Sequence, residues 1–415
     1  MDNKTNIYAE YKPSPLGLIP NDWEVKSMRE CCLIKGEYGI NASAVQYSEN
    51  LPTYIRITDI DDDGNYSTFK KASVKDENSE KFLLNKGDIV FARTGATVGK
   101  TYLYDERDGK LVFAGFLIRF RPDEKKLLVE HLRNFTQTKP YWDWVKTISM
   151  RSGQPGINAE EYGSLKLPLP PLPEQKAIAS LLSTWDAAIQ NNAQLIAQKE
   201  LYKKWLMQQL LTGKKRLKGF SGEWKEVHIK DISKEVSMRN KTDKQLTVLS
   251  CTKYDGLVHS LEYWGRKIFS DDISTYKIVP KNHFAYATNH IEEGSIGYQN
   301  ILDEALISPM YTVFKTDSSV NDDFFYKLLK SHKLIYQYQN RMEGSIDRRG
   351  GLRWDAFSII KIKLPKIEEQ TAITKVLQAS DKEIQLLKAK TDKLKEQKKG
   401  LMQVLLNGKK RLKIK

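Results

Sequence analysis

The chain has 415 residues, and its 67 lysines and arginines against 52 aspartates and glutamates give a formal net charge of +15. This length allows two or three domains, and a basic balance indicates either a polyanionic partner such as nucleic acid or a basic protein without one. No apolar run could span a bilayer, no signal segment follows Met1, and the three cysteines have no metal-ligand spacing. We therefore expect a cytoplasmic protein in a reducing compartment.

The first 165 residues predict an extended arm followed by a mixed domain. Residues 1–22 carry three prolines and are expected to be extended, and the mixed domain starts at Trp23. Residues 123–149 predict one helix, and a glycine loop follows at residues 150–156. The helix is expected to bury Leu127, Leu128, Leu132, Phe135 and Trp142. Runs rich in β-branched and aromatic residues predict strands at Thr53–Ile60, Asp88–Arg93, Lys100–Tyr104 and Leu111–Arg121.

Two segments of this domain imitate ligand-binding loops. Residues 95–101 resemble a phosphate loop, but three residues separate the glycines where four are required, and the flanks favour strand–turn–strand. Residues 59–64 open like a calcium loop, but Lys70 stands where that loop needs a glutamate. His283 and His290 also lack a second ligand at a metal spacing. We expect ordinary turns and neither a nucleotide nor a metal site.

The dominant feature of the sequence is a long repeat. Residues 166–218 and 361–413 align without a gap at an offset of 195, and 24 of the 53 positions are identical. Acidic residues open each copy after a proline, and Gly213 and Gly408 follow the last apolar residues, which predicts a helix of about 38 residues in each copy. The basic runs after these glycines favour phosphate contact or a solubilising helix end about equally.

Both repeat helices carry the same heptad pattern, which predicts a coiled-coil seam. The expected seam residues are Ile178, Leu182, Trp185, Ile189, Asn192, Ile196, Ile373, Leu377, Ile384, Leu387, Leu394 and Leu401. Antiparallel pairing brings polar exceptions together: Asn192 with Thr391, Lys203 with Ser380, and Lys398 with the face of Trp185. A long amphipathic helix packed on its own domain is the less favoured alternative.

After the first helix the same plan returns with different residues. Trp224 stands where Trp23 did, and residues 321–343 predict a helix that buries Phe324, Phe325, Leu328, Leu329 and Tyr336. An arginine- and glycine-rich loop follows at residues 343–351. Strands are predicted at Gln245–Cys251, His283–Asn289, Ser295–Tyr298 and Leu306–Phe314. The helical modules match closely and the globular ones only in plan, which suggests one scaffold with two readers of different targets.

The chain resembles the specificity subunit of a type I restriction–modification system, the HsdS family, over essentially its whole length. The resemblance rests on the segment Leu-Pro-Pro-Leu-Pro-Glu-Gln-Lys-Ala-Ile at 169–178, a weaker copy at 364–373, the Leu-Leu-Thr/Asn-Gly-Lys-Lys-Arg-Leu endings, and Gly87–Lys100. The second domain departs from it, with Ala287-Thr288-Asn289-His290 where the first has Arg93-Thr94-Gly95.

The resemblance implies a subunit that selects a DNA sequence and catalyses nothing. It implies two target-recognition domains, each reading half of a split, asymmetric site in double-stranded DNA. Two modification subunits would dock on the helices and bring S-adenosylmethionine, while restriction (motor–nuclease) subunits would bring ATP and Mg²⁺. This chain itself is expected to hold no cofactor. Readers about one duplex turn apart, ~34 Å or roughly 10 bp, would leave a nonspecific gap of about 5–7 bp.

We expect an α+β fold with an internal pseudo-twofold repeat. Two mixed α/β target-recognition domains, 1–165 and 219–360, alternate with spacer helices at 166–218 and 361–415, packed as an antiparallel coiled coil. Arginine and lysine suit guanine edges and phosphates, and asparagine and glutamine suit adenine. The expected DNA contacts are Arg93, Thr94, Thr97, Lys100, Arg151, Ser152, Gln154, Lys253, Tyr254, Asn289, His290, Arg341, Ser345, Arg348 and Arg349.

Two other functions stay open at this point. One is a coiled-coil scaffold that binds proteins and has no DNA selectivity. The other is a stand-alone DNA-modifying enzyme, against which the lack of any recognisable catalytic constellation argues.

Overall fold

The computed structural model describes residues 10–150, 155–241, 244–343 and 351–412. The chain divides into two compact units, and each long helix contributes one half to each unit. Unit 1 contains residues 1–193 and 389–415, and unit 2 contains residues 194–388. Each unit therefore joins one globular domain to one half of the helix pair.

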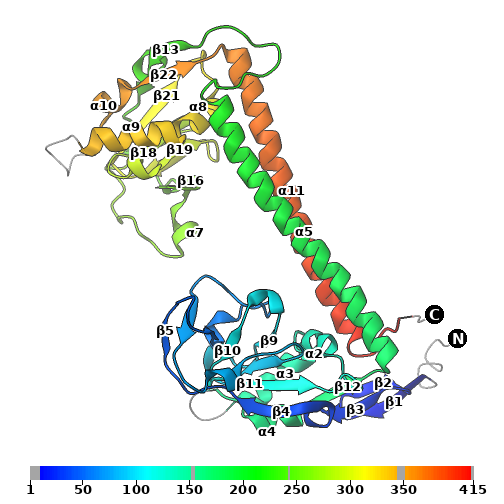
Figure 1. The fold of residues 1–415 in the computed structure, drawn as a ribbon. Coiled ribbons are helices and arrows are strands. Elements are labelled where there is room, and N and C mark those ends of the chain that lie inside the picture. Colours follow the sequence, from blue (N-terminus) through cyan, green and yellow to red (C-terminus); the bar gives the residue numbers. More distant parts are fainter. Residues whose placement is uncertain (1–9, 151–154, 242–243, 344–350, 413–415) are drawn as a thin grey trace. The chain divides into compact units, whose positions relative to one another are not determined.

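Unit 1 is built on two four-stranded sheets, some of whose strands, such as β4, β11, β10 and β5, are labelled in Figure 1. One sheet has the order β4-β11-β8-β9 and is antiparallel, and the other has the order β10-β6-β7-β5. The first comprises β4 (Cys32–Tyr38), β11 (Leu117–Pro122), β8 (Ile89–Ala92) and β9 (Thr101–Leu103). The second comprises β10 (Leu111–Phe113), β6 (Thr53–Ile55), β7 (Ala72–Val74) and β5 (Ala44–Gln46). Their buried faces form the core of the unit.

Helices and short strand pairs complete unit 1. A hairpin precedes the sheets, a two-stranded ribbon joins the domain to the long helix, and three short helices pack on the first sheet's core. The strands are β1 (Tyr11–Ser14), β2 (Gly17–Pro20), β3 (Glu24–Ser27) and β12 (Lys166–Leu169). The helices are α2 (Val129–Phe135), α3 (Lys139–Ser149) and α4 (Ala159–Ser164).

The β4-β11-β8-β9 sheet of unit 1, its principal sheet, has a counterpart in unit 2 with the order β14-β21-β18-β19. Pairings of β15 with β16, β17 with β20 and β13 with β22 accompany it. The sheet comprises β14 (Ser233–Glu235), β21 (Tyr311–Thr316), β18 (His283–Ala287) and β19 (Ile296–Gln299). The paired strands are β15 (Leu249–Thr252), β16 (Gly256–His259), β17 (Lys277–Pro280), β20 (Glu304–Ile307), β13 (Lys225–His228) and β22 (Lys361–Leu364).

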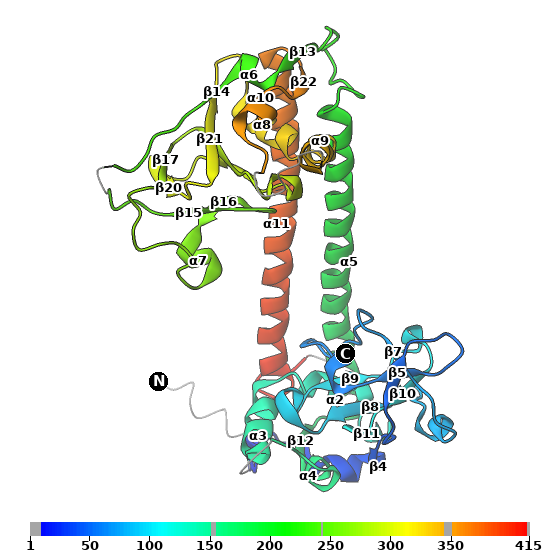
Figure 2. The ribbon, with the colours of Figure 1, turned by 90° about the vertical axis from the view of Figure 1, so that its left-hand side faces the viewer.

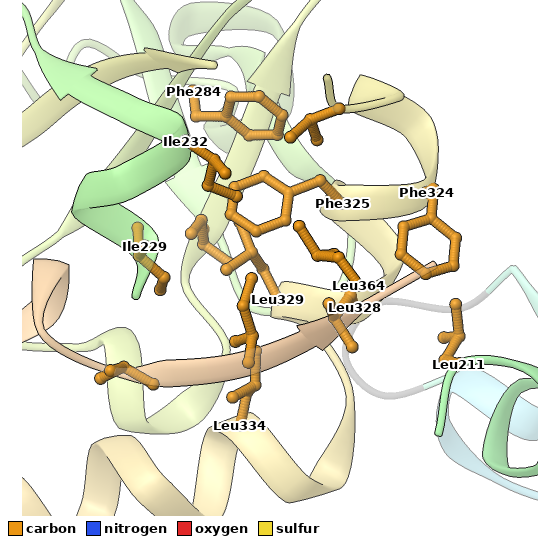
Figure 3. Close-up of a cluster of buried hydrophobic side chains, with 14 of the residues drawn as sticks. Leu211, Ile229, Ile232, Phe284, Phe324, Phe325, Leu328, Leu329, Leu334 and Leu364 are labelled. Carbon is orange, nitrogen blue, oxygen red and sulfur yellow. The ribbon is translucent and has the colours of Figure 1, made fainter. Parts of the chain in front are cut away.

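The core of unit 2 lies between this sheet and its helices. Figure 3 shows Phe284 of the sheet close to Phe325 of α8, with Leu334 of α9 and Leu364 of β22 in the same cluster. The aromatic rings of Phe284 and Phe325 meet edge to face with centroids 5.6 Å apart, an arrangement that favours the ring quadrupoles. The helices are α6 (Ile229–Ile232), α7 (Ser260–Trp264), α8 (Asp322–Leu329), α9 (His332–Glu343) and α10 (Trp354–Ser358).

The two repeat helices are α5 (Leu172–Leu210) and α11 (Ile367–Leu405), each 39 residues long and offset by the 195 residues of the repeat. Figures 1 and 2 both show them side by side. Gly213 and Gly408 follow with φ of 70° and 69°, the left-handed conformation that ends helices. The predicted helices are thus confirmed at both ends.

The helices pair antiparallel in both units. In unit 1, Lys398 Nζ lies 2.6 Å from Asp186 Oδ1, and in unit 2 Lys203 pairs with Asp381. Asp186 and Asp381 are equivalent in the repeat, as are Lys203 and Lys398, so each copy supplies one acid and one base to its partner. The predicted neighbour of Lys398 was Trp185 and that of Lys203 was Ser380. Each lysine instead pairs with the residue that directly follows its predicted neighbour.

The predicted seam residues line this contact. In unit 1, Ile178 and Leu182 are fully buried against Met402, Leu405 and Leu406. Ile373, Leu377, Ile384 and Asn192 are also buried. The remaining predicted seam positions are half-buried, namely Trp185, Ile189, Ile196, Leu387, Leu394 and Leu401.

A second set of reciprocal contacts clasps the helix ends. In unit 1, Arg411 donates to Glu174 from Nε at 3.1 Å and from Nη2 at 2.6 Å, and Trp23 Nε1 donates to the same carboxylate at 3.0 Å. In unit 2, Arg216 donates to Glu369 at 2.5 and 2.6 Å. The arginines of both basic runs are therefore held in ion pairs at the opening turn of the other repeat.

Several predictions of local structure are wrong. Residues 11–20 form the β1–β2 hairpin and not an arm, because Tyr11 Oη donates to Gly408 O at 2.9 Å and fastens the hairpin to the helix end. Each long predicted helix is two helices, α2 with α3 and α8 with α9. The break shifts the helical phase, so Tyr141 and Tyr338 are buried while Trp142 and Tyr336 are 40% and 57% exposed.

Candidate nucleic-acid interface

In unit 1, several predicted contact residues gather at one end of the principal sheet. Arg93 follows β8 directly, and its guanidinium carbon lies 4.8 Å from the ring centroid of Tyr38, the last residue of β4. Its backbone is fixed on both sides, since Arg93 N donates to Phe116 O at 3.0 Å and Arg93 O accepts from Ile157 N at 2.9 Å. The arginine is thus a half-buried cation held on an aromatic face.

The segment after Arg93 is tied to the chain that enters α4. Thr94 bridges to Gly156, and Gly95 N donates to Pro155 O at 3.1 Å. Thr97 Oγ1 donates back to Thr94 O at 3.4 Å within a short 3₁₀ turn. The structure therefore places Thr94 beside Gly156 and Thr97 beside Thr94. The predicted contacts Arg151, Ser152 and Gln154 lie outside the described residues.

The motif that imitated a phosphate loop is a turn between β8 and β9, as the flanks predicted. Gly99 O accepts from Tyr141 Oη at 2.7 Å, and Gly99 N donates to Tyr162 Oη at 3.2 Å. A side chain there would approach Val145 within 2.7 Å. The second glycine of the motif is required by this close packing, which gives it a structural role.

Lys100 contacts other residues than Arg93 and Thr94 do. Its ammonium lies 2.7 Å from Asp62 Oδ1 and 3.4 Å from Ile60 O, both in the acidic turn. The hydrogen bond from Lys100 lowers the pKa of Asp62. Residues 61–65 form a hydrogen-bonded turn in which Asp61 accepts from the backbone of Asp63 and Asn65. The acidic segment thus engages Lys100.

Asp88 of the resemblance motif is a support for the sheet. It is fully buried, and Arg121 donates to it through Nε at 2.7 Å and Nη2 at 2.9 Å. Arg119, almost fully buried, also reaches Asp88 at 3.4 Å and pairs with Glu37. These charges satisfy one another at the end of β8 opposite to Arg93, and they hold β8 and β11 in register.

In unit 2 the corresponding sheet end carries other predicted contacts. Asn289 and His290 are exposed in the turn that follows β18. Thr288 takes the place of Arg93, because Leu352 N donates to Thr288 O at 2.8 Å as Ile157 N does to Arg93 O. The turn packs on α9, where Gln339 Nε2 donates to Glu292 O at 3.3 Å.

Lys253 and Tyr254 form a second exposed turn in unit 2. The ammonium of Lys253 lies 5.4 Å from the ring centroid of Tyr254, which is 79% exposed. Lys330 supports the turn by donating to Tyr254 O at 3.4 Å, and burial lowers the pKa of Lys330. A cation beside an exposed aromatic ring suits both phosphate and base contact.

The last predicted contacts of unit 2 lie on and after α9. Arg341 is half-buried on α9, and its Nη1 donates to Gln337 O at 3.4 Å. Ser345, Arg348 and Arg349 lie outside the described residues. Gly351 approaches Thr288 and Asn289 closely, so the chain lies at the sheet end at this residue.

Some features of these surfaces carry no sequence signal. A cavity of about 570 Å³ opens beside Arg93, lined by residues 38–44, 54–58 and 114–116 among others. Another, of about 450 Å³, is lined by residues from 245–248, 259–262 and 267–273 of unit 2. His290, Glu292 and Glu293 have ligand atoms within 4.8 Å of one another. This group could meet a cation, but it is a mostly exposed surface cluster in which His290 already lies 3.8 Å from Glu293.

The comparisons with known proteins agree with this arrangement. The family model described as the type I restriction modification DNA specificity domain matches residues 20–200 and again residues 221–396. Two curated proteins of Methanocaldococcus jannaschii are similar over nearly the whole of both chains. The putative MjaX specificity subunit is 26% identical, covering 97% of each chain, and the MjaVIII specificity subunit is 25% identical, covering 95% and 94%.

Solved structures share the fold at lower identity. The HsdS subunit from Thermoanaerobacter tengcongensis aligns with a TM-score of 0.53 at 17% identity, covering 94% of this chain and 98% of that one. A chain from work on complex assembly and conformational transition of the type I R-M system aligns with 0.57 at 15% identity, covering 94% and 99%. A specificity subunit from M. genitalium aligns with 0.51 at 15% identity, covering 92% and 96%.

Two domains share one principal sheet order, each has a cation packed on an aromatic ring (Arg93 on Tyr38, Lys253 on Tyr254), and each is followed by one helix of an antiparallel pair. These are the features of a modular DNA-specificity protein. The chain belongs to the type I restriction–modification DNA specificity family. It is the DNA specificity subunit of such a system, the non-catalytic part of the complex. Membership of this family favours the specificity subunit over the two alternatives, a protein-binding coiled-coil scaffold and a stand-alone DNA-modifying enzyme. Among the described residues, no helix has the length and apolar character needed to cross a membrane.

Proposed function

We propose that residues 1–165 and 219–360 are two target-recognition domains, each reading one half of a split, asymmetric site in double-stranded DNA. One observation carries the proposal. The two domains use the same sheet order and the same sheet end, yet Arg93 in the first is replaced by Thr288 in the second. One backbone frame with different side chains is what two readers of different sequences require.

The contacts are proposed to come from loops at these sheet ends. In the first domain Arg93 reads a guanine edge or a phosphate. Further candidate contacts are Thr94, Thr97, Arg151, Ser152 and Gln154. In the second, Asn289 is the candidate reader of adenine, and Lys253 with Tyr254 contacts the backbone. Lys100 is the weakest of the candidates, because Asp62 already neutralises it.

The helices of residues 166–218 and 361–415 are proposed to set the gap between the half-sites and to dock two modification subunits. Half-sites about 10 bp apart leave a gap of about 5–7 bp. S-adenosylmethionine would act on the modification subunits, and ATP with Mg²⁺ on restriction subunits, in the cytoplasm.

An aromatic face on α5 in unit 2 supports docking there. Leu201, Tyr202 and Trp205 are 68%, 53% and 38% exposed, and the rings of Tyr202 and Trp205 stack with centroids 5.6 Å apart. The equivalent residues of the second repeat are Glu396, Gln397 and Gly400. Tyr202→Ala with Trp205→Ala should weaken the binding of one modification subunit and spare the other, as measured by native mass spectrometry. Unchanged stoichiometry and affinity would contradict this docking role.

The decisive experiment is a map of adenine methylation in a host that lacks its own. The host expresses this chain with its modification subunit, in parallel with a chain in which another first domain replaces residues 23–165. A split motif that changes in one half only is the expected result. A contiguous motif, or a change in both halves, would refute two independent readers. Arg93→Ala should weaken the sequence preference in the half of the motif that the first domain reads, and it should leave the other half unchanged.

A further inference from the structure

Both domains present a large apolar side chain at the same position of the fold. In unit 1, β11 begins at Leu117, which pairs with Ala92 at the end of β8. In unit 2, β21 begins at Tyr311, which pairs with Ala287 at the end of β18. The residues directly before these strands, Phe116 and Met310, are therefore topologically equivalent.

The two residues occupy the same kind of turn. Leu117 N donates to Ala114 O at 2.8 Å, and Tyr311 N donates to Ser308 O at 3.0 Å, which closes a four-residue turn in each domain. Phe116 and Met310 stand third in their turns and are 58% and 60% exposed. A four-residue β-turn accepts polar residues readily at its third position. The turn geometry therefore does not require an apolar residue at Phe116 or Met310.

Each apolar tip is joined to the proposed reading residues. Phe116 O accepts from Arg93 N at 3.0 Å, and Phe116 lines the same cavity as Arg93 and Tyr38. Met310 O accepts from Thr288 Oγ1 at 3.0 Å, and the exposed Asn289 follows Thr288. The rest of the two turns differs, with Gly115 in one and Pro309 in the other. What recurs is a bulky apolar group beside the reading loop.

We propose that Phe116 and Met310 are specificity residues that contact the thymine methyl group of an A·T pair, one in each half-site. The methyl group is the one apolar feature that base edges present in the major groove. Polar groups can be read by Arg93 and Asn289, but the methyl group needs an apolar partner. Covering an exposed Phe or Met with this group removes apolar surface from water on both sides. The inference rests on the proposed function, because it needs each domain to face one half-site.

The test is a double-mutant cycle between protein and DNA. The complete complex with modification subunits is first shown to bind and methylate its mapped target. Each thymine of the target is then replaced singly by uracil, which removes only the methyl group. Affinity is measured by anisotropy competition at one fixed salt concentration, since salt alone changes binding strongly. A wild-type complex that does not bind selectively refutes the proposed function at the first step, before the uracil scan.

Removal of the contacted methyl should weaken wild-type binding about fourfold, the equivalent of about 0.8 kcal/mol for one buried carbon. Phe116→Ala should abolish that discrimination in the first half-site and keep it in the second, and Met310→Ala should do the reverse. Phe69→Ala and Met238→Ala are matched controls, since both side chains are exposed, at 87% and 45%, and neither belongs to the turns. The controls should keep discrimination in both halves.

Three results would overturn the proposal. Wild type that binds thymine and uracil equally at every position has no methyl contact. Alanine variants that keep the full fourfold difference show that another residue makes it. A mapped half-site without an A·T pair offers no methyl group to read. All four substituted side chains, Phe116, Met310, Phe69 and Met238, are exposed, so none of the four alanine variants should change the melting temperature.

Discussion

The clasp between Glu174 and Arg411 offers a direct test of how the repeat holds unit 1 together. Glu174 is 1% exposed, and its carboxylate accepts from Arg411 Nε and Nη2 and from Trp23 Nε1. Glu174→Gln keeps the shape of the side chain but replaces one acceptor oxygen by a donor amide. In either orientation the amide N–H groups then face a guanidinium N–H of Arg411, in one of them also the indole N–H of Trp23, and the buried negative charge is lost.

The expected cost follows from the burial of the partners. A hydrogen bond to a charged group contributes about 1.5–3 kcal/mol net, and an unpaired buried donor costs about 1–3 kcal/mol. The guanidinium is 39% exposed and keeps Asp22 at 2.8 Å, which reduces the loss. We expect about 2–4 kcal/mol of lost stability, which lowers the melting temperature of a unit of this size by about 5–15 °C.

Calorimetry of the full chain measures this shift, and hydrogen exchange over residues 11–31 and 402–412 shows whether unit 1 is the part that loosens. Asp22→Asn is the matched control, since its side chain is 48% exposed and its pair with Arg411 should contribute under about 1 kcal/mol. Glu369→Gln should reproduce the loss in unit 2, where Arg216 takes the place of Arg411. Equal, small shifts for Glu174→Gln and Asp22→Asn would refute the reasoning.

Three further predictions concern stability. Leu182→Ala should cost about 2–5 kcal/mol in urea unfolding, because Leu182 is fully buried against α11, whereas truncation of the exposed Leu386 should cost far less. Asp186→Lys should lower the melting temperature, and Asp186→Lys with Lys398→Asp should recover most of it; no recovery would contradict the ion pair. Burial lowers the pKa of His131 from 6.5 to about 4, so the unfolded chain takes up the proton first and stability should fall between about pH 6.5 and pH 4. Phe324 of α8 is the equivalent of His131, because Leu128 and Asn321, each three residues earlier, donate to the equivalent Gln175 and Gln370. His131→Phe should therefore reduce the fall in melting temperature between pH 7 and pH 4.5. An unchanged fall would contradict this role of His131.

The sequence by itself determined the helical scaffold. The ends of α5 and α11 follow from prolines, acidic first turns and the terminal glycines, which are local signals. The antiparallel register could be inferred because it brings together the polar exceptions of the two seams, such as Lys203 and Ser380. The acidic partners of the lysines, Asp186 and Asp381, were found only in the structure. A repeat that pairs with itself carries both sides of its interface in one pattern, so no distant contact had to be guessed.

The tertiary structure decided what local patterns do not encode. Trp142 and Tyr336 were expected to be buried because one continuous helix was assumed in each domain, and the break before α3 and α9 rotated the buried face onto Tyr141 and Tyr338. The acidic residues at the helix starts suited the helix dipole, but only the fold showed Glu174 and Glu369 buried in clasps with the opposite repeat.

The same limit applies to the candidate interface. Arg93 and Asn289 could be selected from the sequence as residues of the right chemistry in loops after strands. Tyr38 and Phe116 could not, because one ends β4 and the other precedes β11, and they meet Arg93 only when β4, β8 and β11 align in one sheet. Periodicity within a segment is a property of the local sequence, whereas the neighbours of a sheet end are set by pairing between strands that are not adjacent in the chain, which only the folded structure fixes.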